Sequence, residues 1–117
     1  MMRGILAAFA ITAIMCVTPA KAAGWCSGTA TNALTNSNGD FMARVSWRND
    51  WVKICSLTQA HGDVSPQTCF AWFSVINNSM SYDKTLTLYY PSITDADCAT
   101  MPTYGAAPVP GYVMMNR

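Results

Sequence analysis

The chain lacks most of the residues that enzymes use. It has no glutamate, and its only histidine is His61, which lies in a polar loop and is best interpreted as solvated. Neither a Gly-x-Ser-x-Gly nucleophile motif nor a Cys-x-x-Cys pair occurs. No glutamate is available to pair with an aspartate, and there is no second histidine and no cluster of metal ligands. The chain therefore has few candidate residues for acid–base or metal-assisted catalysis. The sequence therefore predicts a non-enzymatic protein with no cofactor and no metal site.

Charge is also scarce, since Asp, Glu, Lys and Arg make up only 11% of the chain. Its basic residues are scattered, whereas binding to phosphate backbones needs a clustered basic surface. We therefore expect no nucleic-acid partner.

A long apolar run is missing as well. Near the start of the chain, the basic residue Arg3 is followed by an uncharged stretch over residues 4–17 and by the sequence A-K-A at 20–22. This pattern predicts a secretory signal peptide over residues 1–22, of bacterial type, followed by one small secreted domain over 23–117. The alternative, a membrane anchor, needs ~20 apolar residues. We expect a secreted or periplasmic protein whose mature form does not span a membrane.

Removal of this leader would take Cys16 with it and leave four cysteines, Cys26, Cys55, Cys69 and Cys98. An even number of cysteines in a short exported chain predicts two disulfides. Four cysteines allow three pairings, of which we favour Cys55 with Cys69 and Cys26 with Cys98. A zinc site is the alternative, but the missing Cys-x-x-Cys pair and second histidine argue against it.

Hydrophobic periodicity predicts one helix among five strands. Strands are expected where apolar and polar residues alternate, and the third has two partly apolar faces, which favours an interior position. A long loop over 92–110 is expected to be pinned by Cys98. The predicted strands are 25–36, 41–47, 51–57, 85–90 and 112–115, with a turn over 48–50 and a helix over 65–84. This order matches the small five-stranded OB barrel (β-β-β-α-β-β), and a meandering α+β sheet with one helix is the alternative.

The helix should begin at Ser65, whose hydroxyl can cap backbone amides, with Pro66 at its first position. Apolar residues at helical spacing predict its core face: Cys69, Trp72, Phe73, Ile76 and Met80. A second, weaker stripe contains Ala71, Val75 and Tyr82. It indicates a contact with another copy of the chain, or else exposed apolar residues of the ordinary isolated kind.

Four segments carry a family resemblance: residues 25–28 (WCSG), 52–55 (VKIC), 70–82 (FAWFSVINNSMSY) and 86–90 (LTLYY). Their apolar spacing and aromatic endings resemble the B subunits of pentameric bacterial toxins, in particular the subtilase-cytotoxin and pertussis-like B subunits. The resemblance implies a secreted OB fold that assembles as a ring around its helices and binds cell-surface glycans. The long segment after Tyr90 departs from the family pattern, and no sugar-contacting position of the family is assigned to a residue here.

A cluster of aromatic and polar residues is the predicted ligand site. Sugars bind to aromatic faces beside hydrogen-bonding groups. These features occur together at Trp47, Arg48, Asn49, Asp50 and Trp51. Alternatively, the two tryptophans form a cross-strand pair that clamps the turn. Tyr104, in the long loop, is a second candidate.

Two functions remain open from the sequence. The first is a secreted, carbohydrate-binding, toxin-like B subunit that forms homo-oligomers. The second is a small exported interaction or structural domain that docks on a partner protein.

Overall fold

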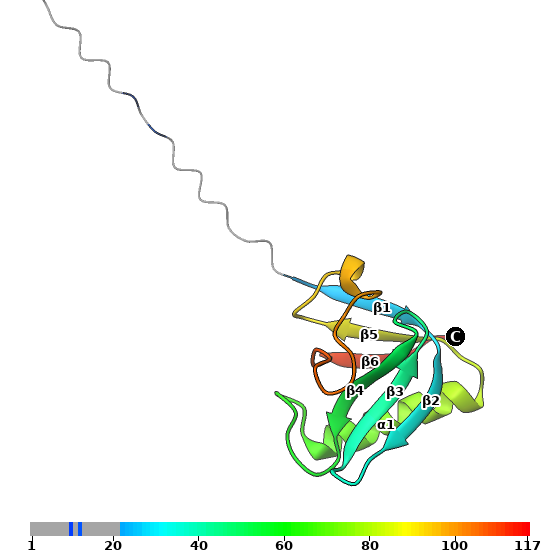
Figure 1. Cartoon of the computed structure of the whole chain (residues 1–117). Coiled ribbons are helices and arrows are strands. Elements are labelled where there is room, and N and C mark those ends of the chain that lie inside the picture. The colour runs from blue at the N-terminus through cyan, green and yellow to red at the C-terminus, as the bar shows by residue number, and fades with distance from the viewer. Residues whose placement is uncertain (1–9, 11, 13–21) are drawn as a thin grey trace, which may run out of the picture.

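The computed structural model describes Ala10, Thr12 and residues 22–117, so the predicted signal peptide lies almost entirely outside the described residues. The described chain is mainly β, with one α-helix and two three-stranded antiparallel sheets (Figure 1). One sheet has the order β1-β5-β6 and the other β2-β3-β4. The strands are β1 (Gly24–Gly28), β2 (Ala30–Thr35), β3 (Asp40–Val45), β4 (Asp50–Ser56), β5 (Leu86–Tyr90) and β6 (Tyr112–Met115). The two sheets are not closed into a barrel.

The predicted first strand, 25–36, is divided between the two sheets. Thr29 separates β1 from β2, and each half pairs with a different partner. At this bend the Thr29 amide donates to Ser46 Oγ and its carbonyl accepts from the Ser46 amide, both at 2.9 Å. One continuous segment therefore links the sheets, which alternation along a single strand does not reveal.

Strand β4 is not an interior strand as predicted, because it lies at the end of its sheet. The pairing shifts between Phe41, opposite Cys55, and Met42, opposite Lys53, so Ile54 is the extra residue of a β-bulge. The bulge allows Ile54 and Cys55 to be fully buried although they are neighbours. Because two consecutive residues are buried at the bulge, apolar residues occur on both faces of this strand in the sequence pattern.

Helix α1 (Pro66–Ser81) has the predicted beginning. The Ser65 hydroxyl accepts a hydrogen bond from the Thr68 amide at 3.1 Å, and Pro66 occupies the first turn. The helix ends at Ser81, before the predicted Lys84. Asp83 adopts a left-handed conformation (φ 54°), and the Lys84 amide donates to the Ser79 carbonyl at 2.8 Å, which closes the helix in a Schellman motif.

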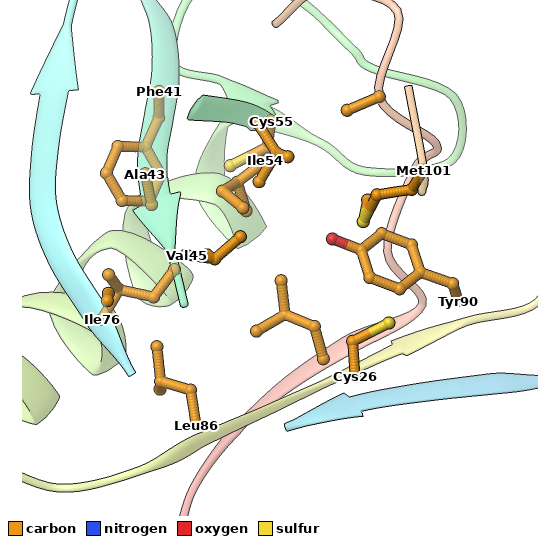
Figure 2. Close-up of a cluster of buried hydrophobic side chains, with 14 of the residues drawn as sticks. Cys26, Phe41, Ala43, Val45, Ile54, Cys55, Ile76, Leu86, Tyr90 and Met101 are labelled. Atoms are coloured by element: carbon orange, nitrogen blue, oxygen red, sulfur yellow. The ribbon is translucent and has the colours of Figure 1, made fainter. Parts of the chain in front are cut away.

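The hydrophobic core lies between the two sheets and α1 (Figure 2). Phe41, Ala43 and Val45 enter it from β3, as the alternation predicts. Leu86, Leu88 and Tyr90 enter it from β5, also as predicted. From the predicted core face of the helix, Cys69 and Ile76 are fully buried, while Trp72, Phe73 and Met80 are partly buried and pack against the core.

Both predicted disulfides are present, Cys26–Cys98 and Cys55–Cys69. The first ties β1 to the long segment after β5, which also contains the short 3-10 helix η1 (Asp95–Asp97) that the sequence did not predict. The second joins β4 to the first turn of α1. Within the described chain, no helix combines the length and hydrophobicity needed to cross a membrane.

Candidate functional site

The structure places the five residues of the predicted ligand site around the β3–β4 turn, but the turn begins earlier than expected. Strand β3 ends at Val45, and the Asn49 amide donates to the Val45 carbonyl at 2.8 Å. Asn49 takes a left-handed conformation (φ 54°), which closes the turn over residues 46–49 instead of 48–50. Trp47 therefore belongs to the turn, and not to the strand.

The two tryptophans of this turn lie in different environments. Trp47 is partly buried and packs against the core, and its Nε1 is buried without a hydrogen-bond partner among the described residues. Trp51 is opposite Arg44 in the β3–β4 pairing. The predicted cross-strand pair of Trp47 and Trp51 is not among the aromatic pairs formed by the described residues.

Polar groups of the turn are mostly engaged within the protein. The Arg48 Nε donates to the Met101 carbonyl at 2.8 Å, and Asp50 Oδ1 accepts from the Trp51 amide at 2.7 Å. The Asn49 Oδ1 accepts from the Arg44 guanidinium at 3.4 Å. These bonds leave fewer free donors and acceptors for a sugar than the sequence suggests.

Tyr104, the second predicted candidate, lies beside Trp51. The Tyr104 amide donates to the Trp51 carbonyl at 2.8 Å, and the Lys53 amide donates to the Tyr104 carbonyl at 3.0 Å. These bonds cover the outer edge of β4 with the long segment. The structure thus brings together two candidate aromatic residues that are far apart in the sequence.

The largest exposed aromatic group lies on the outer face of the other sheet. Trp25, Tyr89 and Tyr112 occupy one row across β1, β5 and β6, and we call these three residues the aromatic platform. Ring centroids are 5.2 Å apart for Trp25 and Tyr89, and 5.1 Å apart for the stacked rings of Tyr89 and Tyr112. Trp25 is 47% exposed and Tyr112 is 41% exposed, so the row of rings is open to solvent.

Hydrogen bonds fix the geometry of the platform. The Trp25 Nε1 donates to the Tyr112 hydroxyl at 2.7 Å, although these strands are not neighbours in the sheet. The Trp25 amide donates to Asp95 Oδ1 at 2.6 Å. Because both ends of the tryptophan are held, the platform is ordered before any ligand binds.

A second row on the same face is polar. The hydroxyls of Ser27 and Thr87 share a hydrogen bond of 2.8 Å, and Asn116 Nδ2 donates to Thr87 Oγ1 at 2.9 Å. Ser27 lies two residues after Trp25 on β1, and its partner Thr87 lies two residues before Tyr89 on the antiparallel β5. Side chains two residues apart on a strand share a face, so hydroxyl groups border the aromatic platform.

Sequence reasoning missed the aromatic platform. The alternation that predicts Leu86, Leu88 and Tyr90 to face the core also implies that Tyr89 faces outward. What the sequence could not supply was the pairing of β5 with both β1 and β6, which sets Tyr89 between Trp25 and Tyr112.

Neighbouring groups or burial displace the pKa values of Asp40, His61 and Asp97. Lys53 forms an ion pair with Asp40 (3.0 Å), and its hydrogen bond lowers the pKa of that carboxyl. Burial lowers the pKa of His61, with a further contribution from the charge of Lys53. The amide and hydroxyl of Thr94, the residue that caps the start of η1, lower the pKa of Asp97. Across the described residues, no three His, Cys, Asp or Glu side chains gather closely enough to hold a metal ion.

No protein-family model, curated protein or solved structure matches this chain. The functional argument therefore rests on the chemistry of the surface itself.

Proposed function

We propose that this protein is a secreted, non-enzymatic glycan-binding module, similar in assembly to the B subunits of pentameric toxins. The observation that carries the proposal is the aromatic platform of Trp25, Tyr89 and Tyr112. Two disulfides are compatible with an extracellular or periplasmic location, where such a module would act.

The aromatic platform suits the chemistry of a sugar ring. One face of a hexose carries several C–H groups, which pack on the flat face of an indole or phenol, while its hydroxyls need hydrogen-bonding partners. Here the outer ring faces of Trp25 and Tyr112, at the two ends of the stack, supply the flat surface, and the exposed Ser27 hydroxyl and the tyrosine hydroxyls supply the partners. The internal bond between Trp25 and Tyr112 reduces the entropy lost on binding, because the rings are already positioned.

The corner formed by Trp51 and Tyr104 is the weaker candidate for the sugar site. Both residues are at least partly exposed, but Arg48 and Asp50 are already bonded within the protein. Because a sugar would have to compete with these bonds, we assign the primary site to the aromatic platform.

Strand connectivity supports an OB-like arrangement. The continuous segment β1–β2 pairs with β5 through its first half and with β3 through its second half. β4 and β6 then extend the two sheets at their ends, and the helix lies between β4 and β5 in the sequence. We infer that the fold is an open relative of the five-stranded barrel, in which β4 pairs with the Tyr104 segment instead of with the last strand.

The outer face of α1 supports a contact between copies of the chain. None of the helix's 16 residues is charged, and Phe70 and Tyr82 at its surface are 63% and 70% exposed. Ala71 is exposed near Phe70, while Val75, from the same predicted stripe, is partly buried against the chain's own core. We therefore extend the predicted oligomer contact of Ala71, Val75 and Tyr82 to include Phe70.

The glycan proposal is tested by binding of the purified secreted protein to a printed array of cell-surface oligosaccharides. Wild-type protein should give signal that Trp25→Ala and Tyr112→Ala each reduce at least about tenfold, the equivalent of 1.4 kcal/mol. Trp51→Ala and Tyr104→Ala are the matched controls and should retain most of the signal. Loss of signal in these controls alone would move the site to the β3–β4 turn.

The competing proposal is a protein-interaction domain. Its support is the uncharged face of α1, which would fit an exported partner protein as well as a second copy. Light scattering after size-exclusion chromatography distinguishes a second copy of the chain from a partner protein as the molecule that binds this face of α1. A ring-sized oligomer that dissociates in Tyr82→Glu supports contact between copies, whereas a monomer with no array signal would favour the partner protein.

A further inference from the structure

A cavity of about 400 Å³ opens beside the aromatic platform. Its walls come from three parts of the chain: the turn before α1, the first turns of α1, and the segments that flank β5 and β6. The side chains in these walls are largely apolar, with Trp72 the largest of them. The walls include Trp72, Pro91, Val109 and Pro110, and Asp63 is the one ionisable residue among them.

The cavity and the platform share a wall. Gly111 lines the cavity, and its amide donates to the Tyr89 carbonyl at 2.7 Å. A Cβ atom added at Gly111 would lie 2.8 Å from Cδ1 of the Tyr89 ring, so the glycine permits this ring to lie against the cavity wall. A chain molecule that packs on the free face of Tyr112 could therefore extend past Gly111 into the cavity.

The one charged residue in the cavity wall is acidic. Asp63 lies in the cavity wall, and Asp95 holds the far end of the platform through the Trp25 amide. No lysine or arginine lines the cavity. Lys53, whose charge reaches His61 next to the cavity wall, is paired with Asp40 at 3.0 Å.

We infer that the cavity is a second subsite of the aromatic platform, and that this subsite selects neutral or amino sugars over acidic ones. This inference rests on the proposed glycan-binding function. A sialic acid or a sulfate group would enter a cavity whose one charged wall residue is Asp63 and whose walls hold no lysine or arginine, so its desolvation there would be uncompensated. A neutral sugar meets only the apolar wall, Trp72 and hydrogen-bonding groups, and an ammonium group gains attraction from Asp63.

The selectivity is tested on an array that pairs each N-acetyllactosamine-terminated glycan with its sialylated form, and N-acetylglucosamine oligomers with their deacetylated, cationic forms. Wild-type protein should bind unsialylated glycans at least about tenfold more strongly than their sialylated forms. Equal or stronger binding to the sialylated forms would overturn the inference and leave the proposed function standing. No signal on any glycan would overturn both.

Two pairs of variants test the cavity itself. Thr68→Phe, on the exposed first turn of α1, should fill the cavity and lower binding of oligosaccharides, while Gln67→Phe adds the same ring outside the cavity and should not. Asp63→Asn should narrow the difference between sialylated and unsialylated glycans, and Asp83→Asn, which removes one charge elsewhere, should leave it unchanged. If Thr68→Phe retains full binding and Asp63→Asn retains full selectivity, the cavity takes no part in recognition.

Discussion

The two disulfides differ in how much of the chain they enclose, and this difference predicts their relative contribution to stability. Cys55–Cys69 joins residues 14 apart, whereas Cys26–Cys98 joins residues 72 apart. A crosslink stabilises the native state chiefly by restricting the unfolded chain, and the restriction grows with the logarithm of the enclosed length. We therefore compare the double variants Cys55→Ala/Cys69→Ala and Cys26→Ala/Cys98→Ala.

The chain-entropy relation gives about 3 kcal/mol for the short loop and about 4.4 kcal/mol for the long one. All four cysteines are buried, so the packing lost on substitution by alanine is similar for the two pairs. The expected difference is therefore about 1.4 kcal/mol. Small domains have total stabilities of about 5–15 kcal/mol, so the variant without Cys26–Cys98 should be close to unfolding.

Urea denaturation followed by tryptophan fluorescence measures the difference, with the wild-type protein as reference. The Cys26→Ala/Cys98→Ala variant should have the lower midpoint, or should fail to fold while the other variant folds. The reverse order would refute the entropic reasoning, since it would mean that local packing at α1 outweighs the length of the enclosed chain.

Three further predictions concern stability. Ile76→Ala should cost about 2–5 kcal/mol because its side chain is fully buried, whereas Trp72→Ala should cost less because its ring borders the cavity; urea midpoints compare them. Ser65→Ala should cost about 1 kcal/mol through loss of the helix cap, measured by the same unfolding curves. Burial lowers the pKa of His61 in the folded protein below its usual value of 6.5, so the unfolded chain binds a proton at a higher pH than the folded protein does. The free energy of unfolding should therefore be highest above pH 6.5 and decline as the pH falls from 6.5 through the lower pKa of the folded state. Midpoints recorded across this range should decline less in His61→Gln.

Local patterns predicted the elements of this fold well. The alternation in β3 and β5 gave the correct inward faces, and Ser65 followed by Pro66 gave the correct helix start, because caps and alternation depend on neighbouring residues alone. Both disulfide pairings were also confirmed.

Features that depend on contacts between residues far apart in the sequence were harder to predict. The division of the first strand at Thr29 depends on its bonds to Ser46, and the bulge at Ile54 depends on the register between two strands. The same limit applies to the site. Trp25 and Tyr112 are far apart in the sequence, and only the strand order β1-β5-β6 brings them to either side of Tyr89.

The most direct test of the central claim uses the indole N–H signals of the four tryptophans in a two-dimensional NMR spectrum, assigned with single Trp→Phe variants. The protein is titrated with the unsialylated glycan that gives the strongest array signal. Our account predicts that the Trp25 signal shifts, because its Nε1 is bonded to Tyr112 within the platform, and that the Trp47 and Trp51 signals do not. Shifts confined to Trp47 and Trp51, with Trp25 unchanged, would contradict it.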